Sequence, residues 1–157
     1  MAPSERAEAR RAVAALAQTW FVHGDFAAGE AAAGSVDTVT ALSVTKWVHL
    51  HTGDAGLRAF FAKVHALLAP GGYFVLEPQP WRSYRAAASK ARRQGLDPAA
   101  LPRDAFFHRT EALELRPEAF PDVLCDEFGF RLVRRLQPPA ATAAGFDRAL
   151  YLFRKPS

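Results

Sequence analysis

The hydrophobic pattern is clearest in the middle of the chain, where it predicts a strand, a helix and a second strand. Residues 36–44 are rich in valine and leucine with threonines interleaved, and this near-continuous apolar character predicts a central strand covered on both faces of a parallel sheet. Asp54 can cap a helix with apolar residues at helical spacing, and the Pro-Gly-Gly sequence at residues 70–72 ends it before a strand at residues 73–76. Two strands joined by a crossover helix form a right-handed unit in which the strands are parallel.

A helix and a short strand are predicted before this unit. Apolar residues three to four positions apart predict an amino-terminal basic helix or extension at residues 1–19. An organelle presequence is the alternative, which the acidic residues of this stretch disfavour. The aromatic and β-branched residues 20–23 are typical of a short strand, so we expect the main domain to cover residues 20–157.

Beyond the second strand, the pattern predicts two helices and two further strands. Residues 82–94 predict a basic helix that either follows an RNA backbone or faces solvent, and the proline-containing residues 95–104 predict a loop. Pro117 opens a shorter helix. The last strands, at residues 130–136 and 149–154, are joined without a helix, so we expect them to be antiparallel and the sheet to be mixed.

Composition narrows the class of protein. The chain has 157 residues, of which 50% are hydrophobic, which is enough to bury one core and predicts a single globular domain. A net charge of +4 suits an anionic partner, although charge alone favours nucleic acid only slightly over an ordinary solvated surface. The single cysteine, Cys125, cannot form an internal disulfide, which favours the nucleus or cytoplasm. No apolar run reaches the roughly 20 residues of a membrane-spanning helix.

Three sequence runs in the middle of the chain are distinctive: ALSVTKWVHL at residues 41–50, LAPGG at 68–72 and LEPQPWRSY at 76–84. LAPGG is common among methyltransferases, whereas the other two runs are far more specific. In their order and spacing they resemble the Bin3-type methyltransferases, the family that contains the methylphosphate capping enzymes of small nuclear RNA. Later runs at residues 115–120 and 150–153 also match, and the resemblance covers about residues 20–156.

The resemblance implies an S-adenosylmethionine-dependent methyltransferase that acts on the 5′ phosphate of a small RNA. It implies the α/β class I methyltransferase fold, a Rossmann-like mixed sheet. Its partners would be the RNA 5′ end and ribonucleoprotein components, with neither a membrane nor a metal ion.

One part of the family pattern is not found in this chain. The Gly-rich cofactor loop and the acidic residue after the second strand do not occur before residue 20, so we expect the chain to begin partway through the domain, without its first two strands. The strand at residues 20–23 would then have no neighbour. A truncated, catalytically inactive half-domain retained for RNA or protein binding is the alternative to an active enzyme.

The chemistry of phosphate methylation indicates which residues to expect in a site. A phosphate oxygen is already anionic near neutral pH, so its in-line attack on a methyl group requires orientation and charge placement rather than a strong base. Lys46 lies just after a parallel strand, where ligands bind in open α/β sheets, and its ammonium group can hold a phosphate; the alternative is a solvated lysine. Glu77 and Gln79, which end the next strand, either contact the transferring group or hold Trp81 in place. Lys46, Glu77 and Gln79 are the predicted catalytic residues.

Substrate and cofactor residues are expected around the same strand ends. Aromatic side chains there can stack a base or a cofactor ring, or simply pack in the core. Two histidines, His49 and His51, lack a third ligand at a metal-site spacing, so no metal site is predicted. The resemblance implies S-adenosyl-L-methionine as cofactor, bound by Asp25, Phe26, Leu42 and Ser43. The predicted substrate-binding residues are Lys46, Trp47, His49, Trp81, Arg82 and Tyr84.

Overall fold

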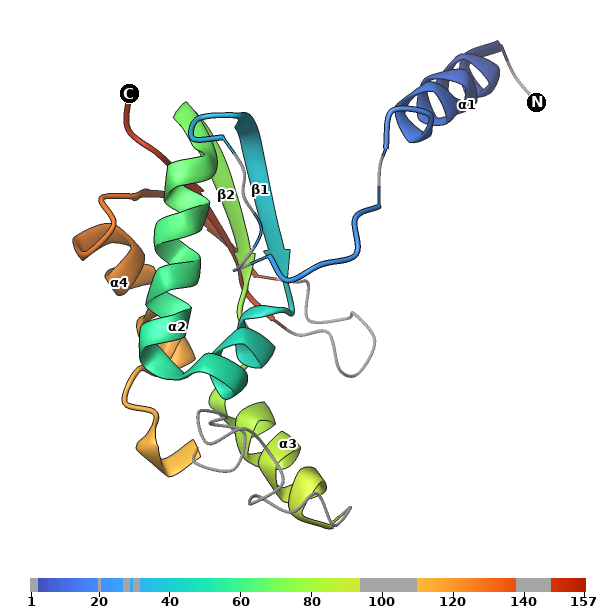
Figure 1. Cartoon of the computed structure of the whole chain (residues 1–157). Helices are drawn as coiled ribbons and strands as arrows, with labels where there is room; N and C mark the ends of the chain where they lie inside the picture. Colours follow the sequence, from blue (N-terminus) through green and yellow to red (C-terminus); the bar gives the residue numbers. More distant parts are fainter. Residues whose placement is uncertain (1–2, 20, 27–28, 30–31, 94–109, 138–147) are drawn as a thin grey trace.

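The computed structural model describes residues 3–19, 21–26, 29, 32–93, 110–137 and 148–157, and Figure 1 shows how they are arranged. The helices and strands are, in chain order, α1 (Pro3–Leu16), β1 (Val36–Leu42), α2 (Thr45–Leu67), β2 (Leu68–Glu77), α3 (Trp81–Arg93), η2 (Thr110–Ala112), η3 (Pro117–Ala119), α4 (Phe120–Asp126), β3 (Arg131–Leu136) and β4 (Leu150–Arg154).

The strands of the described residues form one mixed sheet in the order β1-β2-β4-β3. β1 and β2 are parallel and α2 connects them, which confirms the predicted strand, crossover helix and strand. β4 pairs antiparallel with both β2 and β3, as predicted for the last two strands. Leu76 near the end of β2 lies opposite Ala41 on one side and Tyr151 on the other. The ends of β1 and β2 and the start of β4 therefore meet at one edge of the sheet, which we call the carboxyl edge.

α2 is bent at Gly53, which has a positive φ of 69°, a conformation that favours glycine. Its second part starts at Asp54, where the sequence predicts the helix to begin, and covers the sheet with the buried side chains of Phe61 and Val64. Its first part starts at Thr45, immediately after β1, and the hydrophobic pattern does not predict it. Because of the bend, one continuous segment both covers the sheet and lines the carboxyl edge.

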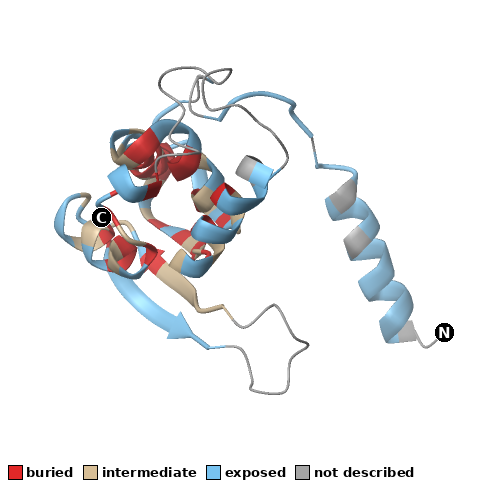
Figure 2. Ribbon diagram, turned by 90° about the horizontal axis from the view of Figure 1, so that it is seen from below, coloured by how far each residue is buried: buried red, intermediate tan, exposed pale blue. Residues whose placement is uncertain are grey.

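The core lies between the sheet and the helices α2 and α4. Four phenylalanines from different elements, Phe61, Phe74, Phe120 and Phe153, are fully buried. Their ring centroids lie 5.6 Å apart for Phe61 and Phe120 and 6.1 Å apart for Phe74 and Phe153. Burial of each such side chain contributes about 1.5–3 kcal/mol. Figure 2 shows the buried residues gathered in the part of the molecule formed by the sheet and these helices. By contrast, α1 is exposed along its described length.

β1 corrects the prediction of a central strand covered on both faces. It is an edge strand of the described sheet, and among its residues only Ala41 is buried. The valines and threonines of this segment reflect its preference for extended backbone, which sequence alone does not separate from burial on both faces. Val36 and Leu42, at the two ends of β1, are exposed.

The strand predicted at residues 20–23 is also wrong where the structure describes it, since residues 21–23 have no strand partner. Phe21 and Val22 are 94% and 90% exposed. An extended segment becomes a strand only when a neighbour accepts and donates its backbone hydrogen bonds, and no described strand does so here. Residue 20 lies outside the described residues.

The remaining predictions are mostly confirmed. α1 and α3 are helices at the predicted places, and Pro117 opens the short η3 helix that continues into α4. The loop predicted at residues 95–104 lies outside the described residues. No helix in the described ranges is long and apolar enough to cross a membrane.

Candidate functional site

The carboxyl edge begins with a tight turn after β1. Ser43 has a positive φ of 58°, which is uncommon for a residue other than glycine and costs on the order of 1–3 kcal/mol. Its backbone N–H donates to the carbonyl oxygen of Glu77 at 3.1 Å, which extends the pairing of β1 with β2 by one hydrogen bond. A strained backbone of this kind persists only where surrounding contacts stabilise it. At Ser43 these contacts come from side chains at the end of β2 and from residues later in the chain.

Gln79 holds this turn in place. Its side chain is buried, its amide nitrogen donates to the carbonyl oxygen of Ser43, and its amide oxygen accepts from the backbone N–H of Lys46 at 3.3 Å. One amide thus joins the turn after β1 to the segment after β2. Because both polar atoms of Gln79 are used in these contacts, the amide fixes the backbone on either side of Ser43 and at Lys46.

A second network joins Ser43, Glu77 and Arg148. The Ser43 hydroxyl donates to Oε1 of Glu77 at 2.5 Å, and Nη1 of Arg148 donates to Ser43 Oγ at 2.5 Å and to the same Glu77 oxygen at 3.2 Å. The side chains of Arg148 and Glu77 are 25% and 19% exposed, so this ion pair is partly shielded from water. Hydrogen bonds of this charged kind contribute more than neutral ones.

Arg148 is a residue of the site that the sequence reasoning missed. It lies two residues before the start of β4, whose first residues pair with the end of β2. An antiparallel strand must begin at the edge where its parallel neighbours end. The sequence predicts only that the last two strands are antiparallel to each other, and it does not show that the last one pairs with β2, so it gives no sign that Arg148 lies at the carboxyl edge.

Lys46 stands beside this network, at the start of α2. Its Nζ lies 4.3 Å from the centroid of the Trp47 ring, and Trp47 is 44% exposed. Burial, and after it the charge of Arg148, lower the pKa of Lys46 below its usual value. The positive charge of Arg148 thus acts on Lys46, and Glu77 supplies one carboxylate that is paired with Arg148. The arrangement favours binding of an anion.

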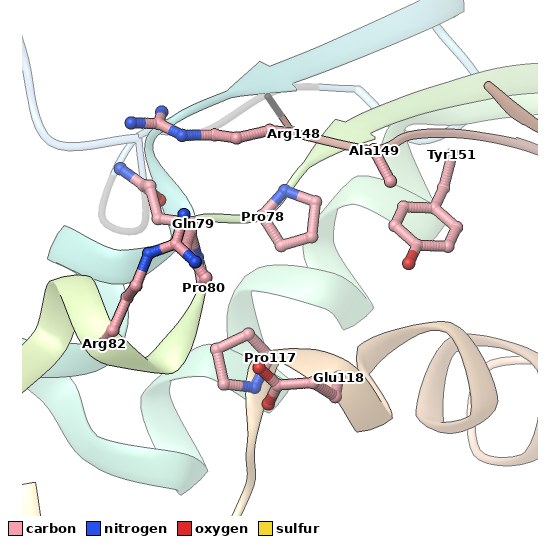
Figure 3. Close-up of a pocket in the computed structure, with 9 residues that line it drawn as sticks. All are labelled: Pro78, Gln79, Pro80, Arg82, Pro117, Glu118, Arg148, Ala149 and Tyr151. Carbon is pink, nitrogen blue, oxygen red and sulfur yellow. The ribbon is translucent and has the colours of Figure 1, made fainter. Parts of the chain in front are cut away.

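A cavity of about 190 Å³ opens next to these residues. Figure 3 shows Arg148 at the top of the cavity and Pro117 and Glu118 at its base, with Arg82 and Tyr151 on the two sides. Its walls therefore combine two guanidinium groups, one carboxylate and apolar ring surfaces. The residues that line it are Pro78, Gln79, Pro80, Arg82, Pro117, Glu118, Arg148, Ala149 and Tyr151.

Two predicted substrate residues, His49 and Tyr84, lie in the interior. Both side chains are fully buried, and their rings meet edge to face at 5.6 Å. His49 Nε2 donates to Asp54 at 2.6 Å, and burial first of all lowers the pKa of His49. Burial also raises the pKa of Tyr84, followed by the charge of Glu118. The substrate contacts expected for His49 and Tyr84 do not fit this geometry, because both side chains support the site from beneath.

Trp81, at the start of α3, lies partly in the interior and partly at the surface. Its ring lies 3.7 Å from the guanidinium carbon of Arg116 and 5.0 Å from the ring centroid of Tyr84. The residue is half-buried, so part of its surface stays accessible. Lys46, Trp47 and Arg82 thus lie at the accessible part of the carboxyl edge. Trp81 lies between this edge and the core.

The predicted cofactor residues are mostly exposed. Asp25 and Phe26 are exposed, and the Phe26 ring lies 5.3 Å from the Phe60 ring on α2. Leu42 is 50% exposed, and the Ser43 hydroxyl is already bonded to Glu77 and Arg148. These residues do not enclose a molecule of the size of S-adenosyl-L-methionine, so the described residues alone do not fit a complete cofactor site. They also contain no group of three or more His, Cys, Asp or Glu side chains that could hold a metal ion.

Comparison with known proteins gives a consistent set of matches. The family described as Bicoid-interacting protein 3 (Bin3) matches residues 36–155. A probable RNA methyltransferase of Arabidopsis thaliana is 44% identical over 120 residues, which are 76% of this chain and 34% of that protein. The 7SK snRNA methylphosphate capping enzyme of Homo sapiens is 38% identical over 127 residues, which are 80% of this chain and 17% of that protein.

Among solved structures, the N-methyltransferase NodS of Bradyrhizobium japonicum is similar, with 20% identity and a TM-score of 0.46. The match covers 85% of this chain and 58% of NodS. The chain spans about a third of the Arabidopsis relative and about a sixth of the human one.

Proposed function

The chain belongs to the Bin3 family, and we propose that it forms the substrate side of an S-adenosylmethionine-dependent methyltransferase that acts on the 5′ phosphate of a small RNA. The descriptions of its relatives support this proposal, since one is a probable RNA methyltransferase and the other a methylphosphate capping enzyme of 7SK snRNA. An RNA substrate implies the nucleus or cytoplasm as the place of action and ribonucleoprotein components as neighbours.

The observation that carries the proposal is the positive carboxyl edge. Lys46 and Arg148 both lie at this edge, the charge of Arg148 contributes after burial to the lowered pKa of Lys46, and Glu77 is the carboxylate bonded to Arg148. An RNA 5′ phosphate is an anion whose oxygen is already nucleophilic at neutral pH, so fixed positive charge around it is the main requirement for orientation. A hydroxyl end would bring no charge to this edge.

We assign the residues of the edge different roles in this function. Lys46 contacts the phosphate, and Trp47 and Arg82 contact the RNA beside it, because these side chains are accessible. Gln79 and Glu77 position the backbone and the cations, since their polar atoms bond to Ser43, Lys46 and Arg148. His49 and Tyr84 support the start of α2 from the interior.

The methyl donor that the family implies is S-adenosylmethionine, and the residues expected to bind it are mostly exposed. We propose that Asp25, Phe26, Leu42 and Ser43 form part of its site, which these four residues do not complete by themselves. The same exposure favours a second candidate function, a non-catalytic domain that binds RNA 5′ ends without transferring a methyl group.

The experiment joins this chain to the part of the Arabidopsis relative that precedes the 120 matched residues, and we call the product the extended protein. Transfer of labelled methyl from S-adenosylmethionine is measured on one RNA sequence with a 5′ monophosphate, a 5′ triphosphate or a 5′ hydroxyl. We expect label on a phosphorylated RNA and none on the hydroxyl form. Equal labelling of the hydroxyl RNA would contradict the proposal. Selective binding of phosphorylated RNA without any transfer would support the non-catalytic alternative.

A further inference from the structure

We propose that Arg148 contacts the substrate, and that with Lys46 it forms a two-cation clamp for the terminal 5′ phosphate of the RNA. This inference rests on the proposed function and extends it to a residue just before β4, outside the sequence runs that carry the family resemblance. It also gives Glu77 a specific part, which is to hold the Arg148 guanidinium in its binding orientation.

The contacts of Arg148 leave much of its guanidinium available. The hydrogen bonds to Ser43 and Glu77 both use Nη1, while a guanidinium carries five N–H groups in a fixed plane. The side chain is 25% exposed and lines the cavity. Figure 3 shows it extending over Gln79, whose amide is bonded to the backbone of Lys46. The remaining N–H groups are therefore available at the carboxyl edge, where Lys46 lies in the first turn of α2.

The charges of the clamp do not balance without a ligand. Lys46 and Arg148 carry two positive charges, and Glu77 returns one negative charge through its contact with Arg148. Gln79, over which Arg148 extends, is bonded to the backbone of Lys46, and the charge of Arg148 adds to burial in lowering the pKa of Lys46. A phosphate monoester carries about 1.5–2 negative charges at pH 7 and would neutralise this surplus.

The geometry also gives a reason for arginine rather than lysine. A guanidinium can hold two phosphate oxygens with two parallel N–H groups, whereas an ammonium acts as a point charge. Arg148 can keep its bonds to Ser43 and Glu77 while it does so, because those bonds use another edge of the fork. The ion pair with Glu77 restricts the side chain before RNA binds, so less rotational freedom is lost in the complex.

The test measures discrimination between RNA ends by the full 157-residue chain. Fluorescence anisotropy gives Kd for one six-nucleotide RNA with a 5′ monophosphate and for the same RNA with a 5′ hydroxyl, at a fixed salt concentration. The ratio of these two Kd values cancels contacts to the rest of the RNA. We expect a ratio of about tenfold or more for the wild-type chain, since one charge-assisted contact contributes about 1.5–3 kcal/mol.

Three variants separate the clamp from general charge. We expect Arg148→Gln to lower the ratio at least fivefold and Arg148→Lys to lower it about threefold, because lysine restores the charge but not the fork. Arg134→Gln, which removes an equal charge from an exposed position on β3, should weaken both RNAs alike and leave the ratio unchanged. Affinity for the hydroxyl RNA and a thermal melt report whether each variant is folded.

The outcomes distinguish this inference from the proposed function. A wild-type ratio near ten together with an unchanged ratio in Arg148→Gln would overturn the clamp and leave the function standing. If Arg148→Gln does not fold, a full wild-type ratio in Arg148→Lys overturns the clamp instead. A wild-type ratio near one, or no binding of either RNA, would overturn both the clamp and the 5′-phosphate substrate.

Discussion

Asp54 connects three parts of the molecule, and its replacement by alanine is expected to lower the free energy of unfolding by about 3 kcal/mol. One carboxylate oxygen accepts from buried His49 at 2.6 Å. The other accepts from the backbone N–H groups of Glu114 and Leu115 at 2.9 and 3.2 Å. Asp54 thus joins the bend of α2 to the segment that leads to Pro117 and the cavity.

The expected loss of stability is the sum of the costs for the groups that lose Asp54 as their hydrogen-bond partner. Without Asp54, the N–H of His49 stays buried and unpaired, which costs about 1–3 kcal/mol. The two backbone N–H groups lie on a segment that water reaches at Glu114, so they add about 0.5 kcal/mol each. Burial acts to raise the pKa of Asp54, but the hydrogen bonds from His49, Glu114 and Leu115 together hold it below its usual value. The carboxylate is therefore ionised at neutral pH.

Urea unfolding followed by circular dichroism at pH 7.5 measures this loss, with the slope of free energy against urea checked for constancy. Asp54→Asn should lose about half as much as Asp54→Ala, because the amide oxygen still accepts one hydrogen bond but carries no charge. Asp126→Ala, which removes an exposed carboxylate on α4, is the matched control and should change stability by less than about 0.5 kcal/mol. A loss below about 1 kcal/mol in Asp54→Ala would refute the account of Asp54 as a connecting residue.

Three further predictions concern the cofactor, the phosphate and pH. The 157-residue chain alone should bind S-adenosylmethionine more weakly than about 10 μM, or about −7 kcal/mol, because its predicted cofactor residues are mostly exposed and do not enclose the molecule. Tighter binding by calorimetry would contradict this. In the extended protein, Lys46→Ala should lower kcat/KM about 30- to 1,000-fold, or about 2–4 kcal/mol, and leave cofactor affinity unchanged. A loss below about threefold would show that Lys46 is only a solvated surface residue. The pKa values of His49 and His65 are lowered in the folded chain. Below about pH 6.5 the unfolded chain therefore binds protons that the folded chain does not. The contribution of these histidines to stability is complete above that pH and falls as the pH drops toward their folded pKa values. Urea unfolding at pH 7.5 and 5.5 should show this fall, and an equal or higher stability at pH 5.5 would rule it out.

The fold was predictable from sequence where local signals agree. The run of β-branched residues, the helical spacing after Asp54 and the Pro-Gly-Gly sequence each act within a few residues, and together they predict β1, the main part of α2 and β2. The position of a strand within a sheet depends instead on distant partners. For this reason the predictions of a covered central strand and of a strand at residues 20–23 are both wrong, although both segments contain residues typical of strands.

The candidate site was predictable as a place but not as a set of contacts. Parallel strands end at one edge, which is why Lys46, Glu77 and Gln79 could be placed together before the structure was known. The partners of their polar atoms could not be predicted, since side-chain hydrogen bonds depend on loop geometry. The inward position of His49 depends on the bend of α2 at Gly53, and helical spacing alone contains no sign of that bend.

The contact between Ser43 and Arg148 also has a consequence for the order of folding. These residues are 105 positions apart in the chain, and Glu77 and Arg148 are 71 apart. Contacts between such distant residues close long loops and form late, after local units such as β1, α2 and β2 have assembled. On a ribosome, a chain that lacks its last residues would already contain this local unit while the two-cation clamp did not yet exist. Selective capture of an RNA 5′ phosphate would then begin only when the final strand has been synthesised and has inserted between β2 and β3.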